Sequence, residues 1–241
     1  MNQSWSIIIF GYNESATIAS VAEKANNFLI ENNIPDSEIL VIDDGSSDNT
    51  QSITNTLKEK IKCLRIIRHH TNLGIGPALI SGYTNAQCEN LIAVPADGQF
   101  DIDELKPNIN IPERAFVSFY RERVENYSVY RNLVTVTNKA FNKYLLNLNV
   151  KDVNWVKAYK TTDLRAIDLK LHSSLIGSEI CAKLQVMGYR AIETPSVYHA
   201  RIAGKARGAS LRTVSHAVME LLKLVFIIRK FKRKLPQSGR S

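Results

Sequence analysis

The sequence predicts an α/β protein with a mostly parallel central sheet, flanked by helices and followed by an amphipathic helix. Three observations lead to this prediction. Short apolar, β-branched runs alternate with segments of helical periodicity through the first half of the chain. Glycine, proline or aspartate follows most of these runs, as is typical of strands that end in loops. The chain has 241 residues, enough for one large domain with a substantial core.

In the first half, four apolar runs are expected to be buried parallel strands. They are Trp5–Phe10, Glu38–Ile42, Leu64–Ile67 and Leu91–Val94. Helices are expected between them, because apolar residues recur there at helical spacing. Ser46, Ser47 or Asp48 is expected to cap the second helix. Since a doubly wound sheet binds ligands at the carboxyl ends of its strands, the residues that follow the strands are the functional candidates.

The second half of the sequence is less regular. Helices are expected over Tyr130–Leu146, Ser174–Val186 and Leu211 to about Lys230, and strands over Ala115–Phe119, Arg190–Glu193 and Val197–Arg201. We therefore expect one domain over residues 1–208, a C-terminal amphipathic helix over 209–235 and a disordered tail over 236–241.

The charge and the cysteines restrict the class of protein. The net charge of +8 indicates an anionic partner. Nucleic acid is not expected, because the basic residues cluster at a loop and a tail and not on an aromatic-bearing face. Three cysteines without metal-site spacing indicate free thiols in a reducing compartment. Neither a signal peptide nor a membrane-spanning run is evident, so we expect a cytoplasmic protein.

Four short motifs occur in order along the chain. They are Phe10–Glu14, Asp43–Thr50, Asn72–Gly76 and Ala96–Gln99. Together they resemble the family 2 glycosyltransferases of GT-A fold, and within them the dolichol-phosphate mannosyltransferase-like, or polyprenyl-phosphate glycosyltransferase, branch. The resemblance covers roughly Trp5 to Leu224. It implies a nucleotide-sugar donor, a divalent cation and an inverting transfer.

The resemblance implies that Asp97 and Gln99 hold Mg²⁺ or Mn²⁺, which would neutralise the leaving diphosphate. Two positions depart from the family. Pro95 stands where the family usually has the first aspartate of Asp-x-Asp, and Phe10 where it commonly has proline. The loss of one carboxylate weakens a site without abolishing it, because substrate phosphates and water supply much of the coordination. The structural alternative is that Asp97 is a turn residue before Gly98.

The same resemblance places the nucleotide at the ends of the strands. The residues expected to line the donor pocket are Tyr12, Asn13, Glu14, Asp43, Asp44, Gly74 and Ala96. Asp43 and Asp44 would hold the base and ribose. The alternatives are structural: a helix cap for Asn13 and Glu14, an acidic helix N-terminus for the two aspartates, and a plain turn for Gly74.

Basic residues are the candidates for binding the acceptor. By resemblance, the phosphate of a lipid acceptor is expected to bind Arg121 (or Arg123) and Arg131, together with the uncharged Thr135. A guanidinium suits this role because it binds phosphate oxygens bidentately. Those that resemble the family's mobile basic loop over the diphosphate are Arg201, Lys205 and Arg207. The alternative for both sets is a solvated surface.

Two carboxylates are candidate bases. Asp152, which precedes Trp155 and Lys157, resembles the acceptor-site aspartate of the family, and Glu179 lies in a Ser-Glu-Ile step placed near the acceptor. A hydroxyl acceptor would need such a base. A phosphate monoester would not, because it is mostly dianionic at pH 7. The histidines His69, His70 and His199 are interpreted as surface or structural residues.

The last expected helix suits a membrane surface. Its apolar stripe includes Leu211, Val214, Val218, Leu221, Leu222 and Val225. A basic cluster, Arg229–Lys234, follows, and each basic residue near an anionic leaflet contributes about 1 kcal/mol. The alternative is a helix that packs on the core or forms an oligomer.

Our hypothesis is a transferase that moves a sugar from GDP-mannose or a UDP-sugar to polyprenyl or dolichyl phosphate, peripherally bound at the cytoplasmic membrane face. One alternative is transfer to a saccharide hydroxyl. Another is a catalytically degenerate nucleotide-sugar-binding protein, which Pro95 favours. A homo-oligomer remains open.

Overall fold

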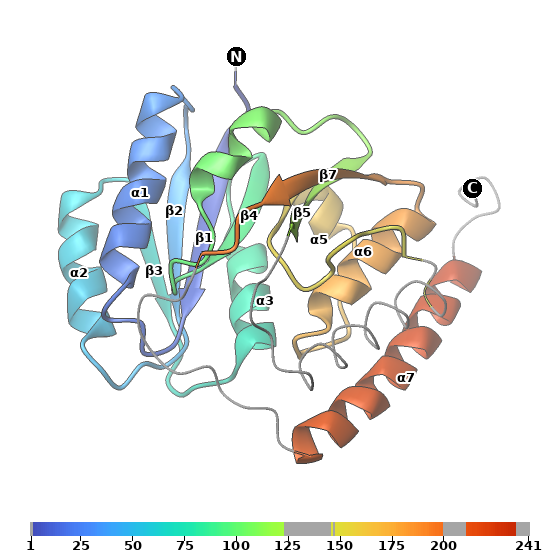
Figure 1. The fold of residues 1–241 in the computed structure, drawn as a ribbon. Helices are drawn as coiled ribbons and strands as arrows, with labels where there is room; N and C mark the ends of the chain where they lie inside the picture. Colours follow the sequence, from blue (N-terminus) through green and yellow to red (C-terminus); the bar gives the residue numbers. More distant parts are fainter. Residues whose placement is uncertain (1, 123–145, 147, 200–210, 235–241) are drawn as a thin grey trace.

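The chain, described here by a computed structural model, is built on a central sheet (Figure 1). The structure describes residues 2–122, 146, 148–199 and 211–234, and within them the sheet has seven strands. Their order is β3-β2-β1-β4-β6-β5-β7. The expected helix over Tyr130–Leu146 lies outside the described residues, apart from Leu146.

The four strands predicted in the first half are confirmed and form one parallel block. They are β1 (Trp5–Gly11), β2 (Glu38–Asp43), β3 (Leu64–Arg68) and β4 (Asn90–Pro95). Ile9 of β1 lies opposite Val41 of β2 and Val94 of β4. The loops that follow β1, β2 and β4 therefore leave the sheet at one edge.

The second half completes the sheet with one antiparallel strand. β5 (Ala115–Arg121) pairs in parallel with β7 (Arg190–Ser196), and β6 (Lys157–Lys160) runs antiparallel between β4 and β5. The predicted strand Arg190–Glu193 is confirmed within β7, which continues through Pro195 to Ser196. The second predicted strand, Val197–Arg201, was wrong over its described residues, because 197–199 are not in a strand. β7 is an edge strand, where the missing N–H of proline is tolerated.

Helices cover both faces of the sheet (Figure 1). One face carries α1 (Ile18–Glu31), α2 (Thr50–Lys60) and the 3₁₀-helix η1 (Ile102–Asn108). The other carries α3 (Ile75–Asn85), α5 (Thr161–Arg165), α6 (Ile176–Val186) and α7 (Leu211–Lys234). Asn49 occupies the N-cap position of α2 but makes no side-chain cap bond. The Thr50 N–H donates instead to the carboxylate of Asp48, one of the three residues predicted to cap this helix, at 3.0 Å.

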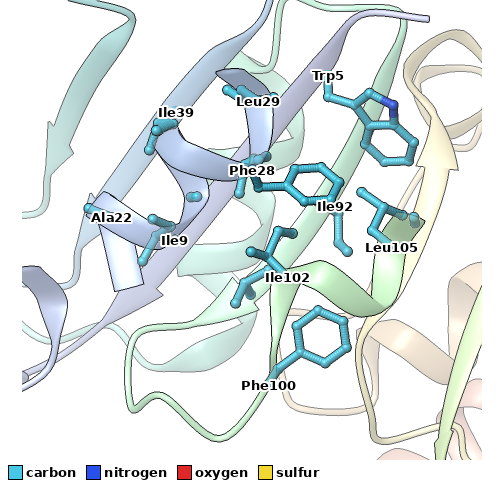
Figure 2. Packing of buried hydrophobic residues seen from close by; sticks show 14 of the residues in the cluster. Trp5, Ile9, Ala22, Phe28, Leu29, Ile39, Ile92, Phe100, Ile102 and Leu105 are labelled. Atoms are coloured by element: carbon cyan, nitrogen blue, oxygen red, sulfur yellow. The ribbon is translucent and has the colours of Figure 1, made fainter. Parts of the chain in front are cut away.

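Two apolar layers hold the helices to the sheet. Alternate side chains of β1 point to opposite faces, so Trp5 and Ile9 pack under α1 with Phe28 (Figure 2). Ile8 packs on the other face, under α3. Burial of each such large side chain contributes roughly 1.5–3 kcal/mol. The second layer extends to α7, whose Leu224 is buried against α6.

Two further expectations can be compared with the structure. Cys63, Cys88 and Cys181 are unpaired, which confirms free thiols. Among the helices that the structure describes, none combines the length and the apolar character needed to cross a membrane.

Candidate active site

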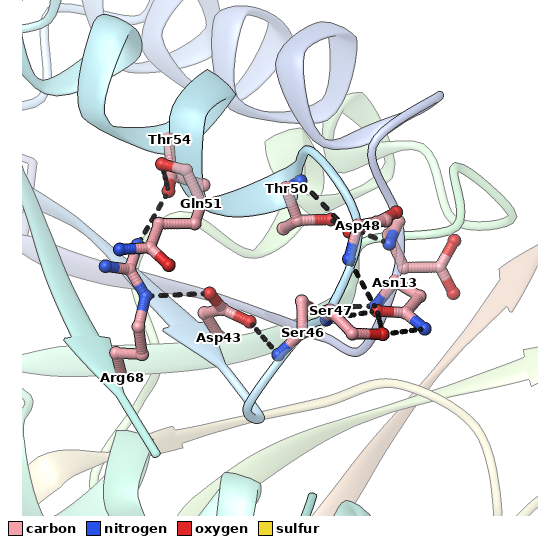
Figure 3. Close-up of polar contacts among 10 residues, drawn as sticks. Asn13, Asp43, Ser46, Ser47, Asp48, Thr50, Gln51, Thr54 and Arg68 are labelled. Carbon is pink, nitrogen blue, oxygen red and sulfur yellow. Dashed lines mark hydrogen bonds and ion pairs between the residues drawn. The ribbon is translucent and has the colours of Figure 1, made fainter. Parts of the chain in front are cut away.

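The loops after β1 and β2 are bound to each other (Figure 3). Asn13 has a positive φ of 58°, and its side-chain oxygen accepts the Ser47 N–H at 2.8 Å. Its own N–H donates to the Ser46 hydroxyl at 2.9 Å. The Glu14 N–H donates to the Thr50 hydroxyl at 3.0 Å. These bonds hold Asn13 and Glu14 at the sheet edge.

Asp43 is committed to structure within this edge. Its carboxylate is buried, pairs with the Arg68 guanidinium at 2.9 Å and accepts the Ser46 N–H at 2.9 Å (Figure 3). It does not line the cleft described below. Asp43 therefore holds the loop after β2 in place. This geometry does not support its predicted role at the base or ribose.

Asp44 connects the end of β2 to the start of α3. Its oxygens accept the N–H groups of Leu73 at 3.0 Å and Gly74 at 2.8 Å. His69 Nδ1 lies 2.7 Å from the same carboxylate, and His69 Nε2 lies 2.8 Å from the Ser81 hydroxyl. Gly74 has φ 92°, a conformation that glycine adopts without strain. The structural interpretation of His69 agrees with these contacts.

These loops enclose a cleft of about 900 Å³ at the carboxyl edge of the parallel strands. Of the residues predicted at the donor or the cation, those that line it are Tyr12, Asn13, Glu14, Asp44, Gly74, Ala96, Asp97 and Gln99. The opposite wall comes from the second half of the chain and includes Asn154, Trp155, Lys157, Gly177 and Tyr198. The structure thus brings together one aspartate from the end of β2 and one from the end of β4.

Asp97 and Gln99 lie on the turn that follows β4. Gly98 between them has φ 74°, and the Gln99 N–H donates to Asp97 Oδ1 at 3.1 Å. Carboxylate and amide oxygens are the hard donors that Mg²⁺ and Mn²⁺ accept, so the pair fits a divalent cation. Across the described part of the chain, no three His, Cys, Asp or Glu side chains gather as a metal site. Substrate phosphates and water would have to complete the coordination.

Arg121 and Asp152, predicted separately for the acceptor, form a bidentate ion pair. Arg121 Nε lies 2.8 Å from Asp152 Oδ2, and its terminal nitrogen lies 3.3 Å from Oδ1. The guanidinium carbon lies 4.9 Å from the Trp155 ring centroid and 5.7 Å from that of Tyr198. Since both rings line the cleft, the Arg121 guanidinium lies beside the cleft in a fixed orientation.

Lys157 organises the loop that carries Asp152 and Trp155. Its buried ammonium nitrogen donates to the carbonyl oxygens of Asp152, Val153 and Trp155 at 2.8–3.0 Å. Burial lowers the pKa of Lys157. The sequence pattern gave Lys157 no role of its own, since a lysine next to an apolar run usually lies at the surface.

Glu179, a candidate base only if the acceptor is a hydroxyl, is not placed to act as one. Its side chain is 0% exposed and does not line the cleft. The carboxylate accepts the N–H groups of Lys170 and Leu171 and pairs with Lys183 at 2.5 Å. All of these partners lie in α6 or in the loop that precedes it, so Glu179 stabilises the fold and takes no part in the reaction.

The other residues predicted at the acceptor phosphate and in the basic loop are not among those that the structure describes. The residues that lie outside the described part of the chain are Arg123, Arg131, Thr135, Arg201, Lys205 and Arg207. Their roles remain predictions from the sequence.

The half-buried carboxyl of Glu104 lies behind the cleft wall that carries Trp155. Trp155 Nε1 donates to the Ser196 hydroxyl at 2.7 Å, and Glu104 Oε1 accepts the Val197 N–H at 2.9 Å. Glu104 Oε2 has no hydrogen-bond partner. Burial raises the pKa of Glu104 above its ordinary value, although the Ser196 hydroxyl and the Val197 N–H oppose the shift. The neighbouring Asp101 has the opposite shift: burial acts to raise its pKa, but the Lys24 ammonium at 2.6 Å and the Asp103 N–H lower it overall.

These opposite shifts predict opposite pH dependences. The folded chain binds more protons at Glu104 than the unfolded chain, so the contribution of Glu104 to the free energy of unfolding falls as pH rises from about 4.5 through the raised pKa. As pH rises from about 4 to about 7, Glu104→Gln should therefore become more stable relative to the unaltered protein. Asp101→Asn, the matched control, should be less stable than the unaltered protein by a nearly constant amount above about pH 5, and this difference should shrink as pH falls below about 4, because the stabilisation that comes with the depressed pKa of Asp101 is lost only there. Urea denaturation at each pH measures the free energy of unfolding of both variants. If that free energy depended on pH in the same way in both variants, the assignment would be contradicted.

Comparison with known proteins agrees with this arrangement. A family described as "Glycosyl transferase family 2" matches residues 6–162. An undecaprenyl-phosphate mannosyltransferase of Micrococcus luteus is 25% identical over 186 residues, which cover 72% of this chain and 76% of that protein. A polyprenol monophosphomannose synthase of Mycolicibacterium smegmatis is 23% identical over 233 residues, 89% of this chain and 85% of that protein.

Among solved structures, a glucosyl-3-phosphoglycerate synthase from Mycobacterium tuberculosis in complex with Mn²⁺, UDP-glucose and phosphoglyceric acid superposes with a TM-score of 0.68 at 16% identity. The match covers 98% of this chain and 82% of that one. A likeness at this identity shows the fold, which is the predicted GT-A fold. Since the family match covers more than half of the sequence, the chain belongs to glycosyl transferase family 2.

Proposed function

We propose that this enzyme transfers a sugar, with inversion, from a nucleotide-sugar donor (GDP-mannose or a UDP-sugar) to a polyprenyl or dolichyl phosphate. The observation that carries the proposal is the cleft, in which Asp44 and Asp97 face the Trp155 and Tyr198 wall that holds Arg121. Relatives named for undecaprenyl phosphate and polyprenol support this choice of acceptor.

The residues of the cleft divide between the two substrates. Tyr12, Asn13 and Glu14 would bind the nucleotide, and Asp97 with Gln99 would hold Mg²⁺ or Mn²⁺. That cation, when bound, would neutralise charge on the leaving diphosphate. Arg121, held by Asp152, would bind the acceptor phosphate.

The reaction then needs positioning more than proton transfer. An oxygen of the acceptor phosphate attacks the anomeric carbon, the bond to the donor diphosphate breaks, and its electron pair leaves on the diphosphate. The attacking phosphate is already mostly dianionic at pH 7, so no base has to remove a proton. Asp152 consequently acts as an orienting partner of Arg121, in agreement with their ion pair.

A donor screen tests the proposal. The purified chain is incubated with Mn²⁺, a short polyprenyl phosphate and each of several GDP- and UDP-sugars, and products are detected by mass. We expect a glycosylated polyprenyl phosphate from one donor. If no donor gives product and nucleoside diphosphates bind equally with and without Mn²⁺ in calorimetry, the degenerate binding protein replaces the enzyme.

The described part of α7 supports the proposed peripheral membrane location. Leu224, Val225 and Ile228 are buried against the domain, so one side of the helix packs on the core as the alternative required. The other side exposes Met219 (59%), Leu222 (55%) and Phe226 (70%). Their spacing of three and four residues places them on one face, which the exposed Arg229 and Lys230 continue. Apolar residues followed by cations suit an anionic lipid surface.

Vesicle flotation tests this location. Met219→Ser/Leu222→Ser/Phe226→Ser should reduce binding to vesicles that contain anionic lipid by roughly tenfold or more, because three exposed apolar side chains no longer insert. Ile30→Ser, which removes an exposed side chain (65%) from α1, is the matched control and should bind normally. Unchanged flotation of the triple variant would refute the membrane-facing role of α7.

A further inference from the structure

The segment Ser196–His199 begins at the last residue of β7 and lies between the turn after β4 and the Arg121 side chain. The His199 N–H donates to the Gln99 carbonyl oxygen at 3.2 Å. Trp155 Nε1 donates to the Ser196 hydroxyl at 2.7 Å. The segment is therefore held at both ends, and Tyr198 sits between these two attachments.

The side-chain amide of Gln99 is oriented by this segment. Gln99 Nε2 donates to the Tyr198 hydroxyl oxygen at 2.5 Å and faces the His199 carbonyl oxygen at 3.4 Å. A backbone carbonyl can only accept, so the nitrogen of the amide has to face this side. The oxygen of the same amide is consequently turned away from Tyr198 and His199.

The Tyr198 ring is itself fixed in place. It packs against the Trp155 ring, with centroids 5.5 Å apart, and the Arg121 guanidinium carbon lies 5.7 Å from its centroid. Tyr198 thus contacts one residue proposed for the cation and one proposed for the acceptor phosphate. An aromatic side chain with only two rotatable bonds can hold both at low entropic cost.

We propose that Tyr198 is a positioning residue: its hydroxyl fixes the amide of Gln99 so that the amide oxygen is presented to the divalent cation. This inference rests on the proposed function, because it takes Asp97 and Gln99 to be the cation's protein ligands. Removal of a residue that is hydrogen-bonded to a metal ligand typically lowers metal affinity by about 10- to 100-fold.

Direct measurement of Mn²⁺ binding tests the inference without an activity assay. Mn²⁺ is titrated by electron paramagnetic resonance in the presence of UDP and, in parallel, of GDP. Tyr198→Phe, which keeps the ring and removes only the hydroxyl, should bind Mn²⁺ about tenfold more weakly at an unchanged melting temperature. Tyr189→Phe is the matched control, since it removes a hydroxyl bonded to Asp163 at 2.9 Å, and it should bind Mn²⁺ normally.

A double-variant comparison separates positioning from a general disturbance of the site. If Tyr198 acts through Gln99, then Tyr198→Phe should cause no further loss of Mn²⁺ affinity in a Gln99→Ala background. Normal Mn²⁺ binding by Tyr198→Phe, or a full additional loss in that background, would overturn the inference. Normal Mn²⁺ binding by Asp97→Ala would instead show that the proposed cation site is wrong.

Discussion

Asp97→Ala should lower the rate of sugar transfer on the order of 10³-fold while the protein remains folded. The cation is expected to stabilise the leaving diphosphate by several kcal/mol, and each 1.36 kcal/mol corresponds to a factor of ten. Asp97 lies on the turn after β4, where its carboxylate accepts the Gln99 N–H at 3.1 Å. Steady-state transfer with a polyprenyl phosphate, together with a melting curve, measures both effects.

Asp152→Asn is the comparison that identifies the acceptor. If the acceptor is a phosphate, Asp152 only orients Arg121, and the variant should lose roughly tenfold, since an amide oxygen still accepts from the guanidinium. If the acceptor were a saccharide hydroxyl, Asp152 would be the base and its loss would cost about 10²- to 10⁴-fold. Equal and complete loss from Asp97→Ala and Asp152→Asn with a phosphate acceptor would contradict the proposed mechanism.

Glu179→Ala should destabilise the fold by about 3–5 kcal/mol, the largest stability effect we expect. The substitution leaves the Lys183 ammonium buried without its carboxylate, and the Lys170 and Leu171 N–H groups lose their acceptor. Lys183 also donates to the Asp168 carbonyl oxygen at 2.5 Å, so the damage should extend to the loop before α6. Guanidinium denaturation measures the loss.

Two further variants make this result specific. Lys106→Ala removes an exposed ion pair with Asp103 at 3.1 Å and should change stability by less than about 1 kcal/mol. Replacing both members, as Glu179→Leu/Lys183→Met, should cost less than Glu179→Ala alone, because no unpaired charge remains. A Glu179→Gln variant with normal stability but no transfer would restore the catalytic role that the structure argues against.

In the first half of the fold, β1, β2 and β4 were predictable because these strands are buried on both faces, whereas the edge strand β3 is buried only at Leu64. Strands buried on both faces appear in the sequence as continuous apolar runs. The predicted ends of β1 to β4 each lie within one residue of the observed ends. β6 was missed because it has only four residues, of which the first and the last are lysines, so it forms no apolar run. Both lysines are buried through contacts that a local pattern does not contain: the carbonyls of 152, 153 and 155 for one, and Glu113 at 2.5 Å for the other.

The candidate site was predictable as a set of positions but not as a set of partners. The edge of a parallel sheet brings the ends of β1, β2 and β4 together, so Asn13, Asp44 and Asp97 line one cleft as expected. The direction of each side chain depends on residues far along the chain. Asp43 turns to Arg68, and Glu179 turns to Lys183. Tyr198 was missed because its contacts with Gln99 and Trp155 exist only after β7 has joined the sheet.

The choice of acceptor is the centre of this account, and a matched pair of lipids tests it most directly. The enzyme is given its sugar nucleotide and Mn²⁺ with either a polyprenyl phosphate or the free alcohol of the same chain length, and products are identified by mass. We expect glycosylated product from the phosphate alone, since only the phosphate is ionised at pH 7 and can pair with Arg121. Equal product from the alcohol would contradict the account.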